Sequence, residues 1–294
     1  MPKLILVLLL LCTVFSCSKK IVQISSDKNI VKITDQIKFN YSGSKAKSVQ
    51  WIFGDGTQSN ELNPSHRYAA SGNFNVIMKA NFGKQIKETN MNIQVKHPEH
   101  CMILLETKFG VMTIRLYDET PEHRDNFVKL VEEGFYKDLL FHRVISGFMV
   151  QGGDPNSRGA SPDTQLGSGG PNYTIPAEFR KEFIHKKGAL SAARTGDQGN
   201  PQKRSSGSQF YIVQGTTQSE SSLTRIEDQK GFKYTDAQKA LYAILGGTPF
   251  LDQDYTVFGE VVEGLDIIDK IAAVQTARGD RPVEDVKMNM KVLK

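Results

Sequence analysis

The residues with the most distinctive chemistry in this chain are an arginine and a glutamine set among large apolar neighbours. Arg143 lies in a strand-length run at 141–145, and Gln151 ends a second run at 148–151, with a turn at Ser146-Gly147 between them. A guanidinium is a planar and permanently charged donor. Taken singly, the two residues could also be a solvated strand arginine and a strand end.

Strand geometry predicts which of these side chains share a face. Alternate side chains of an extended chain lie on the same side. The first run is therefore expected to group three side chains, Phe141, Arg143 and Ile145. The second run must group its side chains in one of two ways, Phe148 with Val150 or Met149 with Gln151.

Several blocks of the sequence, taken in order, resemble the cyclophilins, which are peptidyl-prolyl isomerases built on a closed eight-stranded β-barrel. The blocks are FHRVISGFMVQGGD at 141–154, ALSAAR at 189–194, SGSQFYI at 206–212, FLD at 250–252 and YTVFG at 255–259. Blocks in a shared order are far more specific than any one motif. The resemblance extends from residue 101 to the C-terminus, about two thirds of the chain.

The resemblance implies a role for each matched residue. Arg143 would donate to the prolyl nitrogen as that nitrogen becomes pyramidal, and Gln151 would help to hold Arg143 and the substrate carbonyl. The remaining matches would form the apolar pocket for the proline ring, the backbone edge along which the substrate runs and the adjoining walls: Phe148, Met149, Ala193, Arg194, Gln209, Tyr211, Phe250, Leu251 and Tyr255. No cofactor and no metal is expected.

The chemistry implied is rotation about the peptide bond that precedes a proline. This rotation is slow because amide resonance must be broken, with a barrier near ~20 kcal/mol. Acceleration by about 10⁶ needs only ~8 kcal/mol of preferential binding to the transition state. Hydrogen bonds of ~3 kcal/mol each, placed in advance beside a dry pocket, are of the right size.

Some matched positions depart from the best-known eukaryotic pattern of the family. Arg194 replaces an asparagine, Tyr211 a phenylalanine and Tyr255 a histidine. Phe250 occupies the position of a tryptophan whose indole N–H contacts cyclosporin. Backbone contacts at residue 194 survive any side chain, and the tyrosines keep an aromatic wall. We therefore expect activity to survive and cyclosporin to bind more weakly.

The first residues predict export. Lys3 precedes an apolar run at 4–15 that is too short to span a bilayer and ends in Val14-Phe15-Ser16-Cys17, which resembles a bacterial lipobox. Cleavage would remove a signal peptide at 1–16 and leave Cys17 lipidated at the start of a tether at 17–20. Ser18 favours sorting to the outer membrane of a Gram-negative cell, facing the periplasm. An ordinary secreted signal with an incidental cysteine is the alternative.

Residues 21–96 predict a small β-sandwich, because strand-length apolar runs alternate with turn residues. Trp51-Ile52-Phe53-Gly54-Asp55-Gly56, with a later block at 71–76, resembles a PKD-type immunoglobulin-like domain. Asp55 is interpreted as a turn residue, since one Gly-Asp-Gly lacks the oxygen ligands that calcium requires. Trp51 is expected in the core and His66 as a packed or edge residue.

The rest of the chain completes the predicted architecture. A linker at 97–100 precedes the isomerase domain at 101–294, in which strands are expected at 102–107, 111–116 and 286–293. One helix should begin at Thr120-Pro121 and another should span 264–272, so that two helices cap the barrel. Residues 218–249 are an insertion with a helix that begins at Thr235, whose apolar residues Ala240, Leu241 and Ile244 are expected to pack inward.

Composition fits a soluble globular protein dominated by β-structure, with 39% hydrophobic and 23% charged residues. The net charge of +5 with no dense basic run predicts no nucleic-acid partner, and a monomer is expected. Cys101 is the one cysteine outside the signal region, so no internal disulfide is expected. The leading hypothesis is an anchored isomerase that acts on proline-containing exported polypeptides. Alternatives are a non-catalytic proline-peptide receptor and a protein or glycan binder that acts through the PKD-like module.

Overall fold

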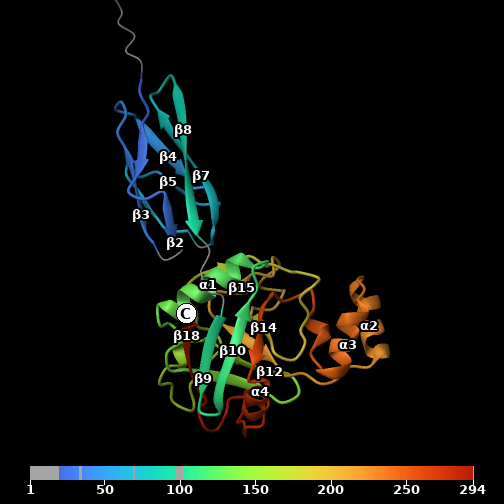
Figure 1. Cartoon of the computed structure of the whole chain (residues 1–294). Coiled ribbons are helices and arrows are strands. Elements are labelled where there is room, and N and C mark those ends of the chain that lie inside the picture. Colours follow the sequence, from blue (N-terminus) through green and yellow to red (C-terminus); the bar gives the residue numbers. More distant parts are fainter. Residues whose placement is uncertain (1–19, 33–34, 69, 97–101, 294) are drawn as a thin grey trace, which may run out of the picture. The chain divides into compact units, whose positions relative to one another are not determined.

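The computed structural model describes residues 20–32, 35–68, 70–96 and 102–293, which form two compact units (Figure 1). The predicted signal peptide at 1–16, the lipidation of Cys17, the linker at 97–100 and Cys101 lie outside the described residues. Within the described ranges, no helix is both long enough and apolar enough to cross a membrane.

The first unit is a β-sandwich. In the described parts of residues 20–96, one sheet runs β1 (Ile24–Ser26), β3 (Ile37–Tyr41) and β6 (Ser65–His66). The other runs β2 (Ile30–Lys32), β8 (Ile86–Lys96), β7 (Gly72–Asn81), β4 (Ser48–Ile52) and β5 (Gln58–Ser59). Phe39 of β3 packs on Trp51 of β4 with ring centroids 5.5 Å apart, and both side chains are fully buried. The prediction of a sandwich with Trp51 in its core is confirmed.

The turn between β4 and β5 depends on two glycines and on the aspartate between them. Gly54 and Gly56 have φ of 85° and 86°, which a side chain would make unfavourable. Asp55 accepts from the backbone N–H of Thr57 at 3.0 Å and bonds His66 Nε2 at 2.7 Å. Burial alone would raise the pKa of Asp55, but its hydrogen bonds with His66 and Thr57 hold that pKa below the ordinary value. Asp55 is therefore built into the turn, and His66 is packed, as expected.

The second unit is a closed antiparallel barrel. Eight strands within residues 102–293 close in the order β10-β17-β14-β16-β12-β11-β18-β9. Their bounds are β9 (Met102–Thr107), β10 (Gly110–Leu116), β11 (Leu139–Ile145), β12 (Met149–Gly152), β14 (Ala189–Ala192), β16 (Phe210–Val213), β17 (Val257–Glu263) and β18 (Lys287–Val292). A short ladder of β13 (Thr174–Ile175) and β15 (Ser205–Ser206) lies in the loops. The predicted barrel is confirmed.

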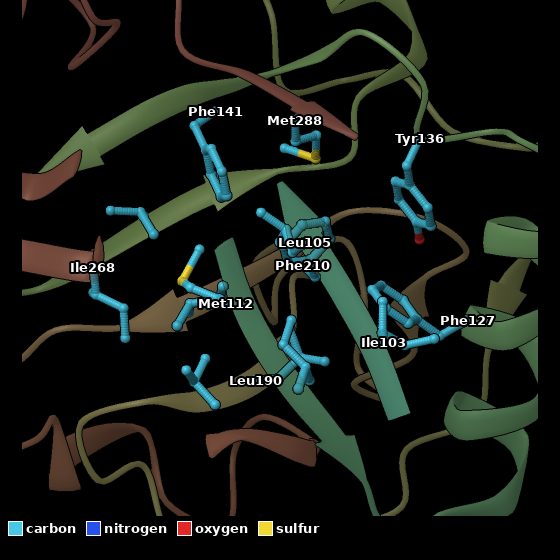
Figure 2. Packing of buried hydrophobic residues seen from close by; sticks show 14 of the residues in the cluster. Ile103, Leu105, Met112, Phe127, Tyr136, Phe141, Leu190, Phe210, Ile268 and Met288 are labelled. Carbon is cyan, nitrogen blue, oxygen red and sulfur yellow. The ribbon is translucent and has the colours of Figure 1, made fainter. Parts of the chain in front are cut away.

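Two amphipathic helices cap the barrel, as predicted. α1 (Pro121–Glu132) lies at one end in Figure 1 and α4 (Leu265–Ala272) at the other. Their apolar faces join one core with the inward side chains of the strands, as Phe127 of α1 and Ile268 of α4 do (Figure 2). Burial of this cluster is the main stabilising term, at roughly 25 cal/mol per Å² of apolar surface removed from water.

The start of α1 differs in one detail from the prediction. Thr120 occupies the N-cap position with Pro121 after it, but its side chain does not cap the helix and donates to Tyr117 O at 3.4 Å. The free N–H groups of Glu122 and His123 are instead bonded by the carboxylate of Glu178, at 3.2 and 3.0 Å. A negative group at a helix N-terminus also complements the helix dipole. Helix α1 is thus capped by a residue more than 50 positions away.

The insertion forms two helices where the sequence predicted one. α2 (Glu220–Lys230) precedes the expected α3 (Asp236–Ile244), and both lie to one side of the barrel (Figure 1). α3 begins with a full capping box between Thr235 and Gln238. A small core of Ile184, Leu223, Ile226, Tyr234 and Tyr242 joins the insertion to the rest of the unit.

The prediction that the apolar residues of α3 pack inward is wrong. Leu241 and Ile244 are 36% and 76% exposed, Ala240 is also exposed, and Tyr242 is the buried side chain of the helix. Because residues one apart on a helix point about 100° away from each other, burial of Tyr242 turns Leu241 outward. The hydroxyl of Tyr242 explains this choice, since it bonds a buried carboxylate, Asp252, at 2.5 Å.

Candidate active site

The predicted site residues converge on a hollow in the outer surface of the barrel. Its volume is about 110 Å³, and its walls come from three neighbouring strands and from the loops beside them. The lining residues are Arg143, Phe148, Met149, Gln151, Ala193, Arg194, Tyr211, Leu251 and Tyr255. Of the predicted set, Gln209 and Phe250 lie beside this hollow without lining it.

Strand alternation places the floor of the hollow outside the barrel. Phe210 and Ile212 of β16 belong to the barrel core, whereas Tyr211 and Val213 belong to a separate apolar cluster. Met149 of β12 belongs to that outer cluster, and Gln151 lines the hollow with it. Of the two groupings that the second run allowed, Met149 with Gln151 is the one that faces the site.

A β-bulge corrects the predicted grouping of the first run. Phe141 pairs with Gly152 and Arg143 with Gln151, so the register shifts at His142. Phe141 therefore points into the barrel core and is 1% exposed, while Arg143 faces the hollow on the other side. The extra residue of a bulge reverses the alternation, which a uniform strand cannot do.

His142, the residue at this bulge, is buried. Its two ring nitrogens have no partner among the described residues. Burial lowers the pKa of its imidazole, an effect that the nearby carboxylate of Asp154 opposes without cancelling it.

Arg143 is held by a residue that sequence reasoning did not identify. Its Nε donates to Asp280 Oδ2 at 3.3 Å, and the backbone of Asp280 accepts from Val144 N–H at 2.8 Å. Asp280 has φ of 62°, in a turn that lies 137 residues further along the chain. The Arg143 side chain is 42% exposed, so the terminal N–H groups of its guanidinium are accessible from the hollow.

Gln151 has a different partner from the expected one. It lies opposite Arg143 in the ladder, but its Nε2 donates to Gln209 Oε1 at 3.2 Å. Gln209 in turn donates to the backbone oxygens of Gly167 and Gly169 at 2.9 and 2.8 Å. The chain of bonds connects Gln151 to the loop at 167–169 and leaves Asp280 to orient Arg143.

Aromatic rings form the apolar wall. Tyr211 is 5% exposed and meets the ring of Tyr255 edge-on at 6.0 Å. The guanidinium of Arg194 lies over Tyr255, 4.4 Å from the ring centroid, in cation–π geometry. Phe250 is 54% exposed and packs on Phe148 with centroids 5.7 Å apart, at the rim of the hollow.

Of the two residues 193 and 194, only Arg194 has backbone groups that the described residues leave free to bind an extended chain. The N–H of Ala193 already donates to Gln209 O at 3.0 Å, and its carbonyl accepts from Ser206 at 2.8 Å. Among the residues that the structure describes, no protein group bonds the backbone N–H or carbonyl of Arg194. Arg194 is therefore the residue of the pair whose backbone remains available. A wider cavity of about 710 Å³, which Gln209 also lines, shares Gln151, Ala193 and Arg194 with the hollow and continues it.

Within the described ranges, no group of three or more His, Cys, Asp or Glu side chains is arranged to hold an ion. The hollow combines the partly exposed guanidinium of Arg143, the amide of Gln151 and an apolar floor. Such an arrangement can bind an apolar ring and stabilise a developing acceptor beside it, without covalent chemistry.

Comparison with known proteins adds independent findings. The family described as "Cyclophilin type peptidyl-prolyl cis-trans isomerase/CLD" matches residues 102–292, and the family described as "PKD domain" matches residues 21–96. A Staphylococcus saprophyticus protein named as a peptidyl-prolyl cis-trans isomerase is 37% identical over 188 residues, which cover 64% of this chain and 88% of that protein.

Two further matches extend over a similar part of the chain. A Streptococcus pyogenes protein named as a bifunctional phosphatase/peptidyl-prolyl cis-trans isomerase is 38% identical over 187 residues, 63% of this chain and 37% of that protein. A crystal structure of a cyclophilin-type isomerase of Cryptosporidium parvum, determined in the presence of the dipeptide Ala-Pro, has 20% identity and a TM-score of 0.47. It covers 66% of this chain and 99% of that chain.

Proposed function

Because the chain belongs to the cyclophilin-type peptidyl-prolyl cis-trans isomerase family, we propose that it rotates X-Pro bonds of exported proteins by a non-covalent mechanism centred on Arg143. The observation that carries the mechanism is the position of Arg143 at the edge of an apolar hollow, with its Nε held by Asp280. The proline ring would occupy the floor formed by Met149, Tyr211 and Leu251. The prolyl nitrogen would then lie beside the guanidinium.

The mechanism follows from how the amide changes as it twists. In the planar peptide the prolyl nitrogen shares its lone pair with the carbonyl and accepts poorly. As the bond rotates the nitrogen becomes pyramidal and its lone pair becomes an acceptor, so a donor from Arg143 strengthens only in the transition state. An interaction of this kind raises kcat and not ground-state affinity. One such donor supplies roughly 3 kcal/mol of the ~8 kcal/mol that a 10⁶-fold acceleration needs.

The substrate backbone would be held along the opposite wall. The free N–H and carbonyl of Arg194 are spaced to bind an extended chain as a neighbouring strand would, while Gln151 faces the substrate carbonyl. The guanidinium of Arg194 lies over Tyr255 and pairs with Asp197, and it does not occupy the backbone N–H or carbonyl of residue 194. This supports the expectation that arginine in place of asparagine leaves backbone binding intact.

The cellular setting rests on the N-terminal sequence. Lys3, the apolar run at 4–15 and Cys17 favour a lipoprotein anchored outside the cytoplasm, with Ser18 favouring the outer membrane. Cys17→Ala should abolish fatty-acid labelling and signal processing, whereas Cys12→Ala should leave both unchanged. Equal labelling of Cys17→Ala and the parent chain would contradict the anchor.

The experiment that tests the function is a proline-isomerisation assay on residues 19–294, with an X-Pro peptide as substrate. We expect acceleration well above the uncatalysed rate. The rival interpretation of a silent proline-peptide receptor predicts binding without acceleration. It required the insertion to block the site, yet the walls of the hollow contain no residue from 218–249. Binding through a Trp51 platform in the PKD domain has no support either, since Trp51 is buried.

A further inference from the structure

A buried carboxylate lies between the insertion and the active site. Asp252, which directly follows the pocket residue Leu251, is 1% exposed. Its Oδ1 accepts from the backbone N–H of His185 at 2.8 Å and from His185 Nδ1 at 2.7 Å. Its Oδ2 accepts from the hydroxyls of Tyr234 and Tyr242, at 2.7 and 2.5 Å. Half of the bonds that make this buried charge tolerable are therefore supplied by the insertion.

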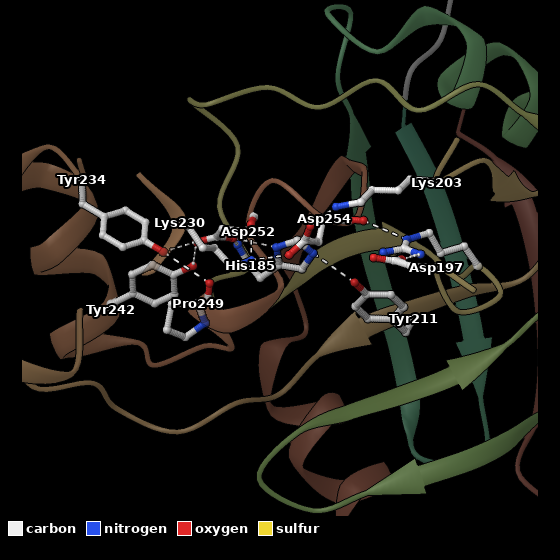
Figure 3. Close-up of polar contacts among 11 residues, drawn as sticks. His185, Asp197, Lys203, Tyr211, Lys230, Tyr234, Tyr242, Pro249, Asp252 and Asp254 are labelled. Carbon is white, nitrogen blue, oxygen red and sulfur yellow. Dashed lines mark hydrogen bonds and ion pairs between the residues drawn. The ribbon is translucent and has the colours of Figure 1, made fainter. Parts of the chain in front are cut away.

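The same network continues into the wall of the hollow. His185 is fully buried, and its Nε2 lies 3.0 Å from the hydroxyl of Tyr211, whose ring lines the proline pocket (Figure 3). A carboxylate can only accept, so the ring proton of a neutral His185 belongs on Nδ1, facing Asp252. Nε2 is then the acceptor, and Tyr211 must donate to it.

The tyrosines are suited to this role as donors. Burial, strengthened by the charge of Asp252, raises the pKa of Tyr242 and of Tyr234 far above the ordinary value. Burial likewise raises the pKa of Tyr211. All three hydroxyls therefore keep their protons at any physiological pH. Tyr242 donates to Asp252 at 2.5 Å, and for Tyr234 the carboxylate at 2.7 Å is a nearer acceptor than Pro249 O at 3.3 Å.

A second set of contacts joins the insertion to the same loop. Lys230, the last residue of α2, donates to the backbone oxygen of Asp252 and to Asp254 Oδ2, both at 2.6 Å. The backbone oxygen of Asp254 accepts from Arg194 Nε at 2.9 Å. Residues 252–254 connect the pocket residues Leu251 and Tyr255. The insertion therefore forms hydrogen bonds with the segment that sets the separation of these two lining residues.

We propose that the inserted helices α2 and α3 position the proline pocket, with Tyr234 and Tyr242 acting through Asp252 and His185 to fix the ring of Tyr211. This proposal rests on the proposed function, because it concerns the same pocket. Tyr234 and Tyr242 are positioning residues that contact no substrate. The tyrosine at position 211 then has a purpose that phenylalanine would not serve, since its hydroxyl joins this ring to the network through His185.

The test is a double-mutant cycle between the two ends of the network. Tyr242→Phe keeps the ring and removes one bond to Asp252, and we expect kcat/KM on an X-Pro peptide to fall about fivefold. Tyr211→Phe removes the hydroxyl through which the insertion would act on the pocket. Adding Tyr242→Phe to that variant should therefore change kcat/KM by less than about 1.5-fold. Losses that multiply in the double variant would overturn the proposal.

A matched control separates positioning from stability. Glu227 is buried within the insertion and bonds Tyr234 N–H, Lys233 and Lys239 without touching Asp252. Glu227→Gln should lower the Tm and leave kcat and KM unchanged. If Tyr242→Phe behaves in the same way, the insertion is a structural addition and the proposal is wrong. Tyr234→Phe repeats the test should Tyr242→Phe fail to fold.

A spectroscopic measurement keeps the test independent of turnover. Nitrogen-15 NMR of His185 should show the Nδ1–H tautomer alone in the parent chain. In Tyr242→Phe it should show a mixture of tautomers. Unchanged signals in the variant would contradict the network. If the parent chain proves inactive, the proposed function fails on its own. The affinity of an X-Pro peptide, measured by calorimetry on the same cycle, would then report whether the insertion still positions the pocket.

Discussion

Arg143→Lys is the most direct test of the mechanism. Lysine keeps the positive charge but replaces a planar set of five donors with one ammonium group. In the parent protein Nε is occupied by Asp280 at 3.3 Å, while the terminal N–H groups remain available to the hollow. A single ammonium group near Asp280 would pair with that carboxylate and could not also face the prolyl nitrogen. The directional donor is therefore lost although the charge remains.

The expected magnitude follows from what one preorganised donor contributes. Its loss costs roughly 3 kcal/mol of transition-state stabilisation, which is about 10²-fold in rate. Because the interaction belongs to the transition state, kcat and kcat/KM should fall together. Affinity for a proline peptide should change little, since the floor of Met149, Tyr211 and Leu251 is untouched. Stability should also be nearly unchanged, because the Arg143 side chain is 42% exposed.

The assay is a coupled isomerisation measurement on an Ala-Pro peptide, with peptide affinity determined separately by calorimetry. Arg115→Lys is the matched control, because Arg115 lies on β10, pairs with Glu260 and does not line the hollow. It should retain full activity. Equal losses of affinity and of kcat/KM in Arg143→Lys, with kcat unchanged, would show that Arg143 only holds the substrate. Full activity in that variant would refute its catalytic part altogether.

Three further outcomes are expected. Asparagine at position 280 tolerates the positive φ of that turn, but Asp280→Asn weakens the half-exposed ion pair with Arg143, so kcat should fall about threefold with KM unchanged. An equal fall when Asp280→Asn is added to Arg143→Lys would show that Asp280 does not act through Arg143. Phe250 has no N–H donor for cyclosporin, so Phe250→Trp should tighten inhibition by the ~1 kcal/mol of a hydrogen bond, and an unchanged inhibition constant would refute this account of the rim. Burial alone would raise the pKa of Glu260, but Lys186 and Arg115 hold that pKa below the ordinary value. Glu260 therefore stabilises the fold at pH values above its unfolded pKa, and this stabilisation is lost as the pH falls through its folded pKa. Urea unfolding should show Glu260→Gln less stable than the parent at pH 7 and nearly as stable as the parent in strong acid.

Much of the fold could be predicted from local patterns. Period-two apolar runs bounded by Gly, Pro and Asp located most strands within a few residues, since those patterns depend on the chain's immediate neighbours. The capping helices α1 and α4 were evident from helical spacing. Helix α2 was missed because it contains only Leu223 and Ile226 as large apolar residues, a signal too sparse to distinguish from a polar loop.

The membership of the site was also largely predictable, but not its internal contacts. The blocks that resemble cyclophilins contain every residue that lines the hollow. Asp280 lies outside those blocks and reaches Arg143 only because β11 and the turn before β18 are neighbours in the barrel. Gln151 donates to Gln209, and no spacing in the sequence distinguishes that partner from Arg143.

The sequence by itself therefore determined most of the segments that extend or coil, and the side chains that gather at the hollow, because both follow from short-range patterns and from ordered motifs. Only the tertiary structure decided which way those side chains face. The bulge at His142 separates Arg143 from Phe141, and the bond from Tyr242 to Asp252 turns the apolar residues of α3 outward. In each case a contact with the segment that follows in the chain outweighs the side-chain pattern of the element itself. For α3 the reason is that leaving a buried charge without partners costs more free energy than exposing a leucine.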